Sequence, residues 1–169
     1  MAALCFPCIC DRMGKTGATK GGRQVDVTIR KMQSSDVEAL YRLLSDPMVM
    51  RYLESPYDRA QTETFLRRAG LAEPPLVYAV QEGEHFIGYV SYHDYDESSV
   101  EIGWVLFPKY WGRGYASELT DRLISWARKA RKGIVIECVP EQTATVHFAI
   151  QKGFRADGMA GGLAVYRLM

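Results

Sequence analysis

The chain has 169 residues, of which 47% are hydrophobic and 24% are charged, and its formal net charge at pH 7 is +1. These values are typical of one globular domain, and the balanced charge argues against general affinity for nucleic acid or for anionic membranes. No apolar run approaches the roughly 20 residues that span a bilayer. We therefore expect a cytoplasmic protein that binds neither nucleic acid nor membrane.

The start of the chain differs from the rest. Cys5, Cys8 and Cys10 are followed by a stretch rich in Gly, Lys and Thr that has no apolar period. A zinc site would need a second pair of ligands at suitable spacing, and the three histidines stand far away in the sequence, so we expect no metal site. We predict a flexible leader over residues 1–24 and a single domain over residues 25–169.

Hydrophobic periodicity predicts ten elements in chain order. Alternating Val25, Val27 and Ile29 predict a first strand. Ser35-Asp36-Val37-Glu38 has the pattern of a capping box, and Asp46-Pro47 ends the helix that the box opens. The remaining expected elements are a helix over 58–68, strands over 76–80, 86–92 and 100–107, a helix over 116–127, a strand over 134–136, a helix over 143–151 and a strand over 163–168.

This order predicts an α/β fold with a mixed sheet. Strands joined by hairpins come first, and strand–helix–strand crossovers, which give parallel pairs, come later. Because elements of both kinds alternate, we expect helices on both faces of the sheet.

The most informative motif is the turn after the strand at 100–107, which reads Trp111-Gly112-Arg113-Gly114-Tyr115-Ala116-Ser117. Two glycines at a strand-to-helix turn let backbone N–H groups converge on an anion. The N-terminus of the next helix adds unpaired N–H groups and the positive end of its dipole. Such a turn is typical of a pyrophosphate site, and Arg113 adds a cation at its rim.

A dinucleotide-binding Rossmann protein is the rival interpretation of this turn. Gly112-x-Gly114-x-x-Ser117 nearly matches the NAD(P) fingerprint, and Glu137 stands about 20 residues further on, where an acid that binds ribose would be. Three features disfavour it: Ser117 holds the third small position, the turn is too long, and hairpins precede the motif.

Four segments resemble the GNAT superfamily of N-acetyltransferases, and within it the RimJ/RimL-like branch of ribosomal-protein N-terminal acetyltransferases. The turn is similar to the superfamily's acetyl-CoA signature, Gln/Arg-x-x-Gly-x-Gly/Ala, with Trp111 at its first position. The resemblance covers about residues 26–168 and implies a mostly antiparallel sheet with a βαβ core, splayed between the fourth and fifth strands. The four segments are 28–53, the strand pair 87–89 and 101–104, 110–118 and 141–154.

The resemblance implies an acetyl-CoA-dependent N-acetyltransferase in which a primary amine attacks the thioester directly in a ternary complex. The implied acceptor is a small-molecule amine or a protein N-terminus, and the implied assembly is a monomer or homodimer. The implied donor contacts are the backbone near Val105 and Leu106 for the pantetheine arm, residues 111–117 for the pyrophosphate, and Gln142, which stands where the family usually has Asn.

Two carboxylates are candidates for the general base. The attacking amine must be neutral, and amine pKa values of about 10.4 for lysine and about 7.7 for an α-amino group make a base useful. Glu101 and Glu137 stand one on each strand beside the expected splay, although either fits a solvated or ion-paired carboxylate equally well. His93 is the weaker candidate, because a histidine in a polar loop is more often structural.

One departure from the family pattern concerns the leaving group. Many members carry a tyrosine, thought to protonate the leaving thiolate, where this chain has Ala149. The general acid therefore stays open, and a non-catalytic acyl-CoA-binding or sensing module on the same fold is the alternative function. Cys138 stands on an apolar strand and is expected to be a small buried hydrophobe rather than a nucleophile.

Overall fold

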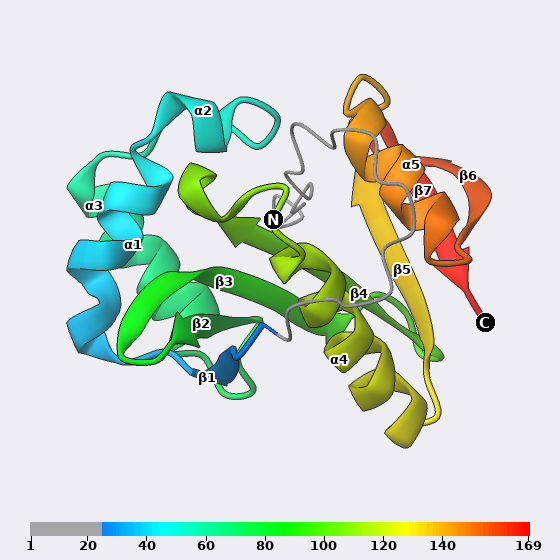
Figure 1. Ribbon diagram of the computed structural model, residues 1–169, viewed down its shortest axis with the longest axis horizontal. Coiled ribbons are helices and arrows are strands. Elements are labelled where there is room, and N and C mark those ends of the chain that lie inside the picture. The colour runs from blue at the N-terminus through cyan, green and yellow to red at the C-terminus, as the bar shows by residue number, and fades with distance from the viewer. Residues whose placement is uncertain (1–24) are drawn as a thin grey trace.

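The computed structural model describes residues 25–169, which form a seven-stranded sheet with helices on both faces (Figure 1). The strand order is β1-β2-β3-β4-β5-β7-β6, and every neighbouring pair is antiparallel except the parallel pair β4 and β5. The strands are β1 (Thr28–Lys31), β2 (Val77–Glu82), β3 (His85–Asp94), β4 (Ser99–Leu106), β5 (Gly133–Cys138), β6 (Arg155–Ala160) and β7 (Leu163–Leu168). The mixed, mostly antiparallel sheet expected from the sequence is confirmed.

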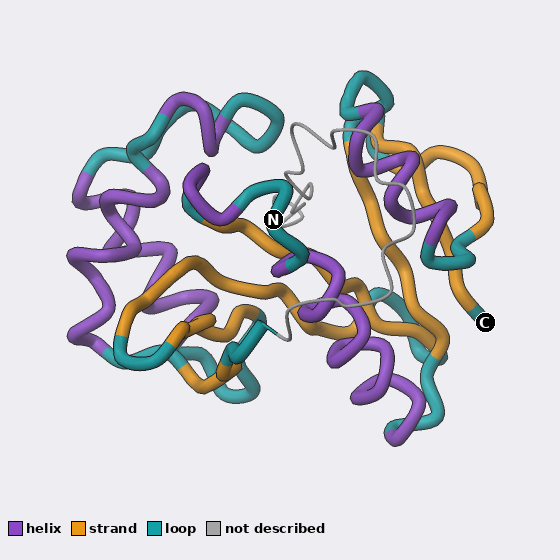
Figure 2. The backbone as a smooth tube through the Cα atoms, viewed as in Figure 1, coloured by secondary structure: helices purple, strands orange, loops and turns teal. Residues whose placement is uncertain are grey.

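The helices divide into two groups that pack on separate hydrophobic clusters. Helices α1 (Val37–Leu44) and α3 (Arg59–Phe65) pack on β2 and β3, in a cluster that also holds Val105 of β4. Helices α4 (Tyr115–Lys129) and α5 (Thr143–Gln151) pack with the alternate β4 residues in the other cluster. Figure 2 shows the remaining short helical segments between these elements: η1 (Ser34–Asp36), α2 (Pro47–Met50), the π-helical turn η2 (Leu66–Gly70) and η3 (Pro108–Tyr110).

The parallel pair β4 and β5 separates after three residues. The register joins Ser99 to Gly133, Val100 to Ile134 and Glu101 to Val135, and beyond this point the two strands diverge (Figure 1). On its other side β5 stays paired with β7 as far as Cys138. The splay between the fourth and fifth strands is therefore present, and it opens toward the C-terminal ends of both strands.

The structure corrects the expected helix start. The capping box joins Gln33 and Asp36, rather than beginning at Ser35, and it opens η1 before α1. The Asp36 carboxylate accepts from the Gln33 N–H at 2.8 Å and, at the same time, from the Arg30 guanidinium on β1. Asp46-Pro47 ends α1 as expected, and Asp46 also caps the short helix α2 by accepting from the Met48 N–H at 2.8 Å.

Strand β6 was not predicted. Its residues are Arg-Ala-Asp-Gly-Met-Ala, nearly all of them exposed, so the sequence has no alternating apolar pattern there. Its pairing with β7 shifts register between Ala156 and Met159. The expected leader over residues 1–24 lies outside the described residues. Within residues 25–169 no helix combines the length and apolar character that crossing a membrane requires.

The Arg30–Asp36 ion pair gives a prediction about stability. Arg30 Nη1 and Nη2 donate to the two carboxylate oxygens of Asp36 at 2.8 and 2.7 Å. Burial acts to raise the pKa of Asp36, but the hydrogen bonds from Arg30 and Gln33 outweigh it and hold this pKa below its ordinary value. Because the folded-state pKa is the lower one, the stabilisation is complete above the unfolded pKa of about 3.9 and is lost as the pH falls through the folded pKa.

We therefore expect Asp36→Asn to lower the free energy of unfolding at pH 7 by about 2 kcal/mol and to flatten its decline in acid. Urea denaturation at a series of pH values measures both effects. Glu73→Gln is the control, because Glu73 pairs with Lys31 in an ion pair whose side chains are 80% and 64% exposed, and such pairs contribute about 0–1 kcal/mol. An equal, small effect of both substitutions would contradict the prediction.

Candidate functional site

The glycine turn lies directly at the N-terminus of α4. Gly112 and Gly114 adopt left-handed φ values of +65° and +89°, and Gly114 is the N-cap of the helix. A Cβ built on Gly114 would meet only Val25 Cγ2, at 3.9 Å, among the described residues. The first N–H groups of a helix have no intrahelical partner, and in α4 these are the N–H groups of Tyr115, Ala116 and Ser117. The turn can therefore hold an anion with backbone groups alone.

Side chains of the turn fix its shape rather than reach outward. Trp111 Nε1 donates to the Leu106 carbonyl oxygen at 2.8 Å. The Tyr115 hydroxyl donates to the Glu82 carboxylate at the end of β2, which raises the pKa of Tyr115, and its ring is buried. Arg113 Nη1 donates to the Lys109 carbonyl at 3.2 Å, so this cation stays at the rim of the turn, as the sequence suggested.

Of the two β4 residues predicted to contact the pantetheine arm, Val105 and Leu106, only Leu106 points its backbone N–H toward the splay. The Phe107 N–H donates to Ile87 of β3 at 3.1 Å. Because N–H groups alternate in direction along a strand, the Leu106 N–H points away from β3 and toward the diverging β5. The Val105 N–H points toward β3, and the Val105 side chain packs with α1 and α3. Leu106 is therefore the better donor for a ligand in the gap.

Gln142 is a buried amide at the open end of the splay. It lies between β5 and α5, its N–H donates to Val139 at 3.0 Å, and the residue is 2% exposed. Neither Nε2 nor Oε1 of its side chain has a hydrogen-bond partner within residues 25–169. A buried amide left in this state costs about 1–3 kcal/mol per group. The side chain therefore retains hydrogen-bonding capacity that residues 25–169 do not use.

The two predicted carboxylates lie on the sheet face opposite α4. Strand register aligns His93, Glu101, Val135 and Arg167 across β3, β4, β5 and β7, and aligned residues share a face. Glu137 lies two residues beyond Val135 and so shares that face too. Glu101 is 4% exposed and Glu137 is 7% exposed. The structure therefore brings both carboxylates to one buried surface beside the splay.

His93 lies next to Glu101. Its Nε2 is 3.8 Å from Glu101 Oε2, and the imidazole is mostly buried. Burial lowers the pKa of His93, and the opposing effects of Asp94 and Glu137 do not cancel it. The imidazole is therefore neutral at pH 7, and a neutral imidazole accepts protons. The sequence ranked His93 as a loop residue, whereas the structure places it at the end of β3 beside the candidate base.

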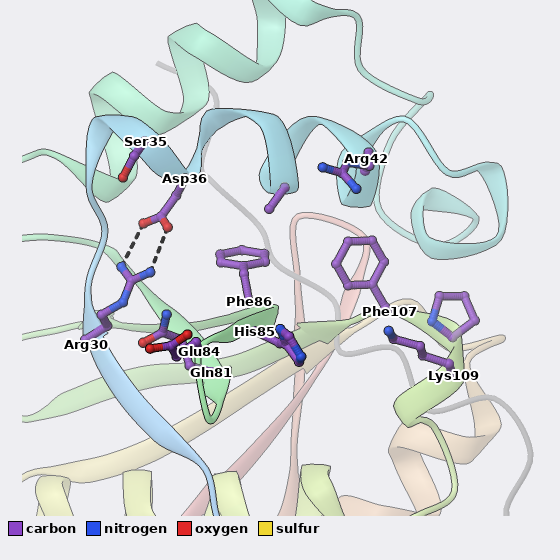
Figure 3. Close-up of a pocket in the computed structure, with 12 residues that line it drawn as sticks. Arg30, Ser35, Asp36, Arg42, Gln81, Glu84, His85, Phe86, Phe107 and Lys109 are labelled. Carbon is purple, nitrogen blue, oxygen red and sulfur yellow. Dashed lines mark hydrogen bonds and ion pairs between the residues drawn. The ribbon is translucent and has the colours of Figure 1, made fainter.

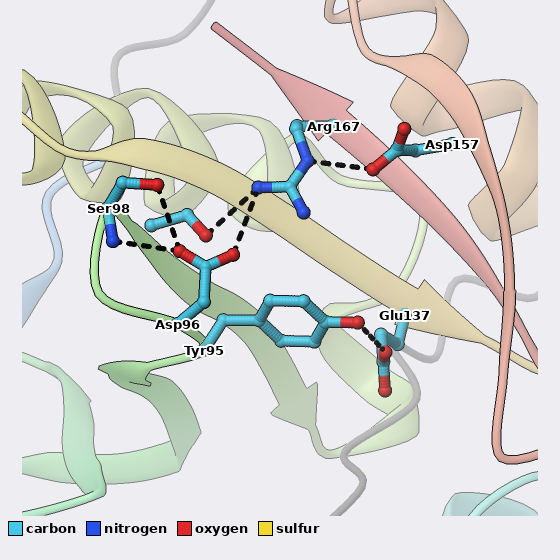
Figure 4. A network of polar contacts seen from close by, with 7 residues as sticks. Tyr95, Asp96, Ser98, Glu137, Asp157 and Arg167 are labelled. Carbon is cyan, nitrogen blue, oxygen red and sulfur yellow. Dashed lines mark hydrogen bonds and ion pairs between the residues drawn. The ribbon is translucent and has the colours of Figure 1, made fainter.

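Sequence reasoning missed Tyr95, which contacts the candidate base Glu137. The Tyr95 hydroxyl donates to Glu137 Oε1 at 2.8 Å (Figure 4). Burial, with the Glu137 hydrogen bond next in size, raises the pKa of Tyr95 to about 12. Local sequence could not show this contact, because the two partners stand 42 residues apart along the chain.

The remaining candidates have structural roles. Cys138 is fully buried, and burial together with the Glu137 charge raises its thiol pKa to about 11, so the thiolate is scarce at neutral pH. Ala149 is also fully buried, on the face of α5 that packs against the sheet. Within residues 25–169 no group of three His, Cys, Asp or Glu side chains is arranged to hold a metal ion. The three N-terminal cysteines lie outside the described residues.

A separate cavity of about 710 Å³ lies between α1, the β2–β3 turn and η3 (Figure 3). Arg42, Lys109, Phe86 and Phe107 point toward it, and the Arg30–Asp36 pair forms one wall. Only residues outside the predicted site line this cavity.

Comparisons with known proteins agree with this geometry. Residues 26–155 match the family described as an acetyltransferase (GNAT) domain. YnaD of Bacillus subtilis strain 168, named as an uncharacterised N-acetyltransferase, is 27% identical over 135 residues, which are 77% of this chain and 79% of YnaD. A GNAT-family acetyltransferase from Bacillus anthracis superposes with a TM-score of 0.75 at 25% identity, over 85% of this chain and 94% of that one.

Two further structures share the fold at lower identity. RimL, a ribosomal L7/L12 alpha-N-protein acetyltransferase solved with coenzyme A, superposes with a TM-score of 0.72 at 19% identity, over 86% of this chain and 96% of that one. A spermidine N-acetyltransferase from Vibrio cholerae, solved with CoA and spermine, gives a TM-score of 0.69 at 21% identity, over 83% of this chain and 92% of that one.

Proposed function

The chain belongs to the GNAT acetyltransferase family, and on that premise we propose that it transfers the acetyl group of acetyl-CoA to a primary amine by direct attack in a ternary complex. The single observation that carries the proposal is the N-terminus of α4, where Gly114 at a left-handed φ begins the helix and, among residues 25–169, a Cβ there would meet only Val25 at 3.9 Å. A pyrophosphate fits there because the helix dipole and the N–H groups both favour an anion.

The donor's pantetheine arm is proposed to lie in the splay. Leu106 offers its N–H on one side, and the Gln142 amide, without a partner in the described part of the chain, stands on the other. The arm carries amide groups that both donate and accept, so it would satisfy Gln142 where the protein does not. Holding the thioester next to the amine turns a two-molecule encounter into an effectively unimolecular step.

The acceptor amine is proposed to bind on the face that carries Glu101 and Glu137. Its ammonium gives one proton to a carboxylate, directly or through His93 or water. The neutral nitrogen then forms a bond to the thioester carbon and the carbon–sulfur bond breaks. The newly bonded nitrogen gives up its second proton to water, and the departing thiolate takes up a proton. With Ala149 buried in the core, we assign that last proton to water.

The acceptor class is proposed from the face and from the neighbours. Two buried carboxylates favour a cationic amine, because opposite charge offsets the cost of their burial. RimL acts on a ribosomal protein N-terminus and the Vibrio enzyme on spermidine. We accordingly propose a protein N-terminus or a small polyamine-like amine as acceptor, an enzyme of the RimJ/RimL-like branch, and a cytoplasmic location.

The first test combines binding and turnover. At a concentration of acetyl-CoA about 100 times its Kd, we expect stabilisation by about 2.7 kcal/mol, which is about 5–10 °C in Tm for a chain of this size. Thermal shift measures this, with NAD(H) as the control ligand. Thiol release should then follow with at least one member of an amine panel that includes spermidine and short peptides with free N-termini.

Two other outcomes separate the alternatives. Stabilisation without release by any amine would favour a non-catalytic acyl-CoA-binding module, which the buried Ala149 also suits. Stabilisation by NAD(H) alone would overturn the assignment of the glycine turn.

A further inference from the structure

The β3–β4 turn is tied to β7 by one guanidinium group. Arg167 Nη1 donates to Ser99 Oγ at 2.9 Å and to Asp96 Oδ2 at 3.4 Å (Figure 4). Arg167 Nε donates to Asp157 Oδ2 of β6 at 2.8 Å. The guanidinium carbon also lies 5.7 Å from the centroid of the Tyr95 ring, within reach of a cation–π contact. Arg167 therefore joins three elements and the Tyr95 ring at a single point.

We call Arg167 together with Asp96, Ser99 and Asp157 the arginine clamp, and the Asp96 carboxylate in this clamp is itself held in place by hydrogen bonds. Asp96 Oδ1 accepts from the Ser98 N–H at 2.8 Å and from the Ser98 hydroxyl at 3.0 Å. Hydrogen bonds from Ser99 and Ser98 hold the pKa of Asp96 well below its usual range, so it stays ionised. Individual ion pairs of this exposure are weak, but several hydrogen bonds from one planar guanidinium fix the orientation of the Arg167 side chain.

The arginine clamp contacts the Tyr95 ring, and the Tyr95 side chain extends from there across the sheet to Glu137. Tyr95 leaves the turn at the N-terminal end of β4, whereas Glu137 lies toward the C-terminal end of β5. The ring spans this distance over the face that carries Glu101, and its hydroxyl ends on Glu137 Oε1 (Figure 4). Because its pKa is about 12, the hydroxyl keeps its proton at neutral pH and always acts as the donor.

Resting on the acetyl transfer proposed above, we propose that Tyr95 is a positioning residue that fixes the Glu137 carboxylate toward the acceptor amine, and that Arg167 acts through Tyr95. A carboxylate accepts about four hydrogen bonds, so the bond from Tyr95 orients Glu137 without using the whole accepting capacity of the group. A fixed carboxylate loses less entropy when the acceptor binds.

A purely structural role for Tyr95 makes different predictions. A buried carboxylate needs hydrogen bonds whatever its function, so loss of the hydroxyl would lower stability and leave turnover of the folded enzyme intact. A positioning role requires that turnover falls in the folded enzyme, and that the fall depends on Glu137.

The experiment begins with Tyr95→Phe, which keeps the ring against Arg167 and removes only the hydroxyl. We expect kcat with the best acceptor to fall about tenfold, the loss typical of a hydrogen bond to a charged group, while the KM for acetyl-CoA stays within about twofold. Tyr57→Phe is the matched control. Its hydroxyl also donates to a carboxylate, Glu54 Oε2 at 2.9 Å, and its pKa is also raised to about 12, but it packs against Phe65 of α3. We expect the control to keep wild-type kcat.

A double-mutant cycle then tests whether Tyr95 acts through Glu137. In a Glu137→Gln background, adding Tyr95→Phe should change kcat by less than about twofold, because the group it positions is already gone. Arg167→Gln should lower kcat in the wild type and add little in the Tyr95→Phe background. Effects of Tyr95→Phe and Glu137→Gln that multiply would overturn the proposal.

The outcomes separate this inference from the proposed function. No thiol release by the wild type with any amine would remove both. Wild-type release, with equal rates for Tyr95→Phe and Tyr57→Phe or with no effect of Glu137→Gln, would remove the positioning role and leave acetyl transfer standing.

Discussion

Replacing Gly114 with valine is expected to abolish CoA binding, raising the Kd by more than about 100-fold. The φ of +89° lies where a β-branched residue is strained by about 1–3 kcal/mol. The added side chain would also stand at the first turn of α4, where the pyrophosphate is proposed to lie and where a Cβ meets only Val25 among residues 25–169. Both effects act on the same N–H groups, which is why the expected loss is large. Isothermal titration with CoA measures it directly.

Gly158→Val is the matched control for this substitution. Gly158 also has a left-handed φ, +99°, and a Cβ there would meet nothing within 4 Å among the described residues. It lies in β6, far along the chain from α4, so the backbone strain is reproduced without the ligand contact. We expect Gly158→Val to reduce stability and to leave the Kd for CoA near its wild-type value. If Gly114→Val bound CoA normally, the pyrophosphate would have to lie elsewhere.

The second large effect is expected from Glu101→Gln. The substitution keeps the size of the side chain and removes its ability to take a proton, so kcat should fall about 10²- to 10³-fold, within the range of general base catalysis. The Kd for CoA should stay unchanged, because Glu101 lies on the face opposite α4 and α5. Steady-state thiol release together with CoA titration separates the two effects.

Glu73→Gln is the control for a change from carboxylate to amide. Glu73 is exposed and pairs only loosely with Lys31 at 3.1 Å, so we expect wild-type turnover. A normal kcat in Glu101→Gln would exclude Glu101 as the base and would direct attention to Glu137 and His93. A rate lost in Glu101→Gln with CoA binding also lost would indicate a folding defect instead.

Some parts of the site follow from local sequence, and the structure agrees with them. The two glycines at positions 112 and 114 take the left-handed φ that only glycine adopts without strain, and they open a long helix as its periodicity predicted. The apolar alternation of β4 puts Ile102 and Trp104 in one core and leaves Glu101 on the other face. Family membership was expected from the resemblance and is confirmed by the family match, and the mixed sheet was expected from the order of the elements and is confirmed by the strand pairing.

Other parts were beyond local sequence. Strand β6 has no apolar alternation, because it is an exposed edge strand held by its pairing with β7. The capping box begins at Gln33 rather than at Ser35. Its Asp36 carboxylate also accepts hydrogen bonds from Arg30 on strand β1, a contact that local sequence does not reveal. The direction of the Leu106 N–H depends on which edge of β4 pairs with β3 and in which register, and the sequence of β4 alone does not encode this pairing.

The sequence by itself determined the features whose causes lie within one or two turns of chain: the helices, the strands with an apolar period, the glycine turn and, through it, the family. Only the tertiary structure decided which side chains meet. Tyr95 reaches Glu137 across 42 residues and Arg167 reaches Ser99 across 68. The physical reason is that periodicity and turn chemistry act over local backbone, whereas a contact across the sheet depends on strand order and register, which are set by the packing of the whole core.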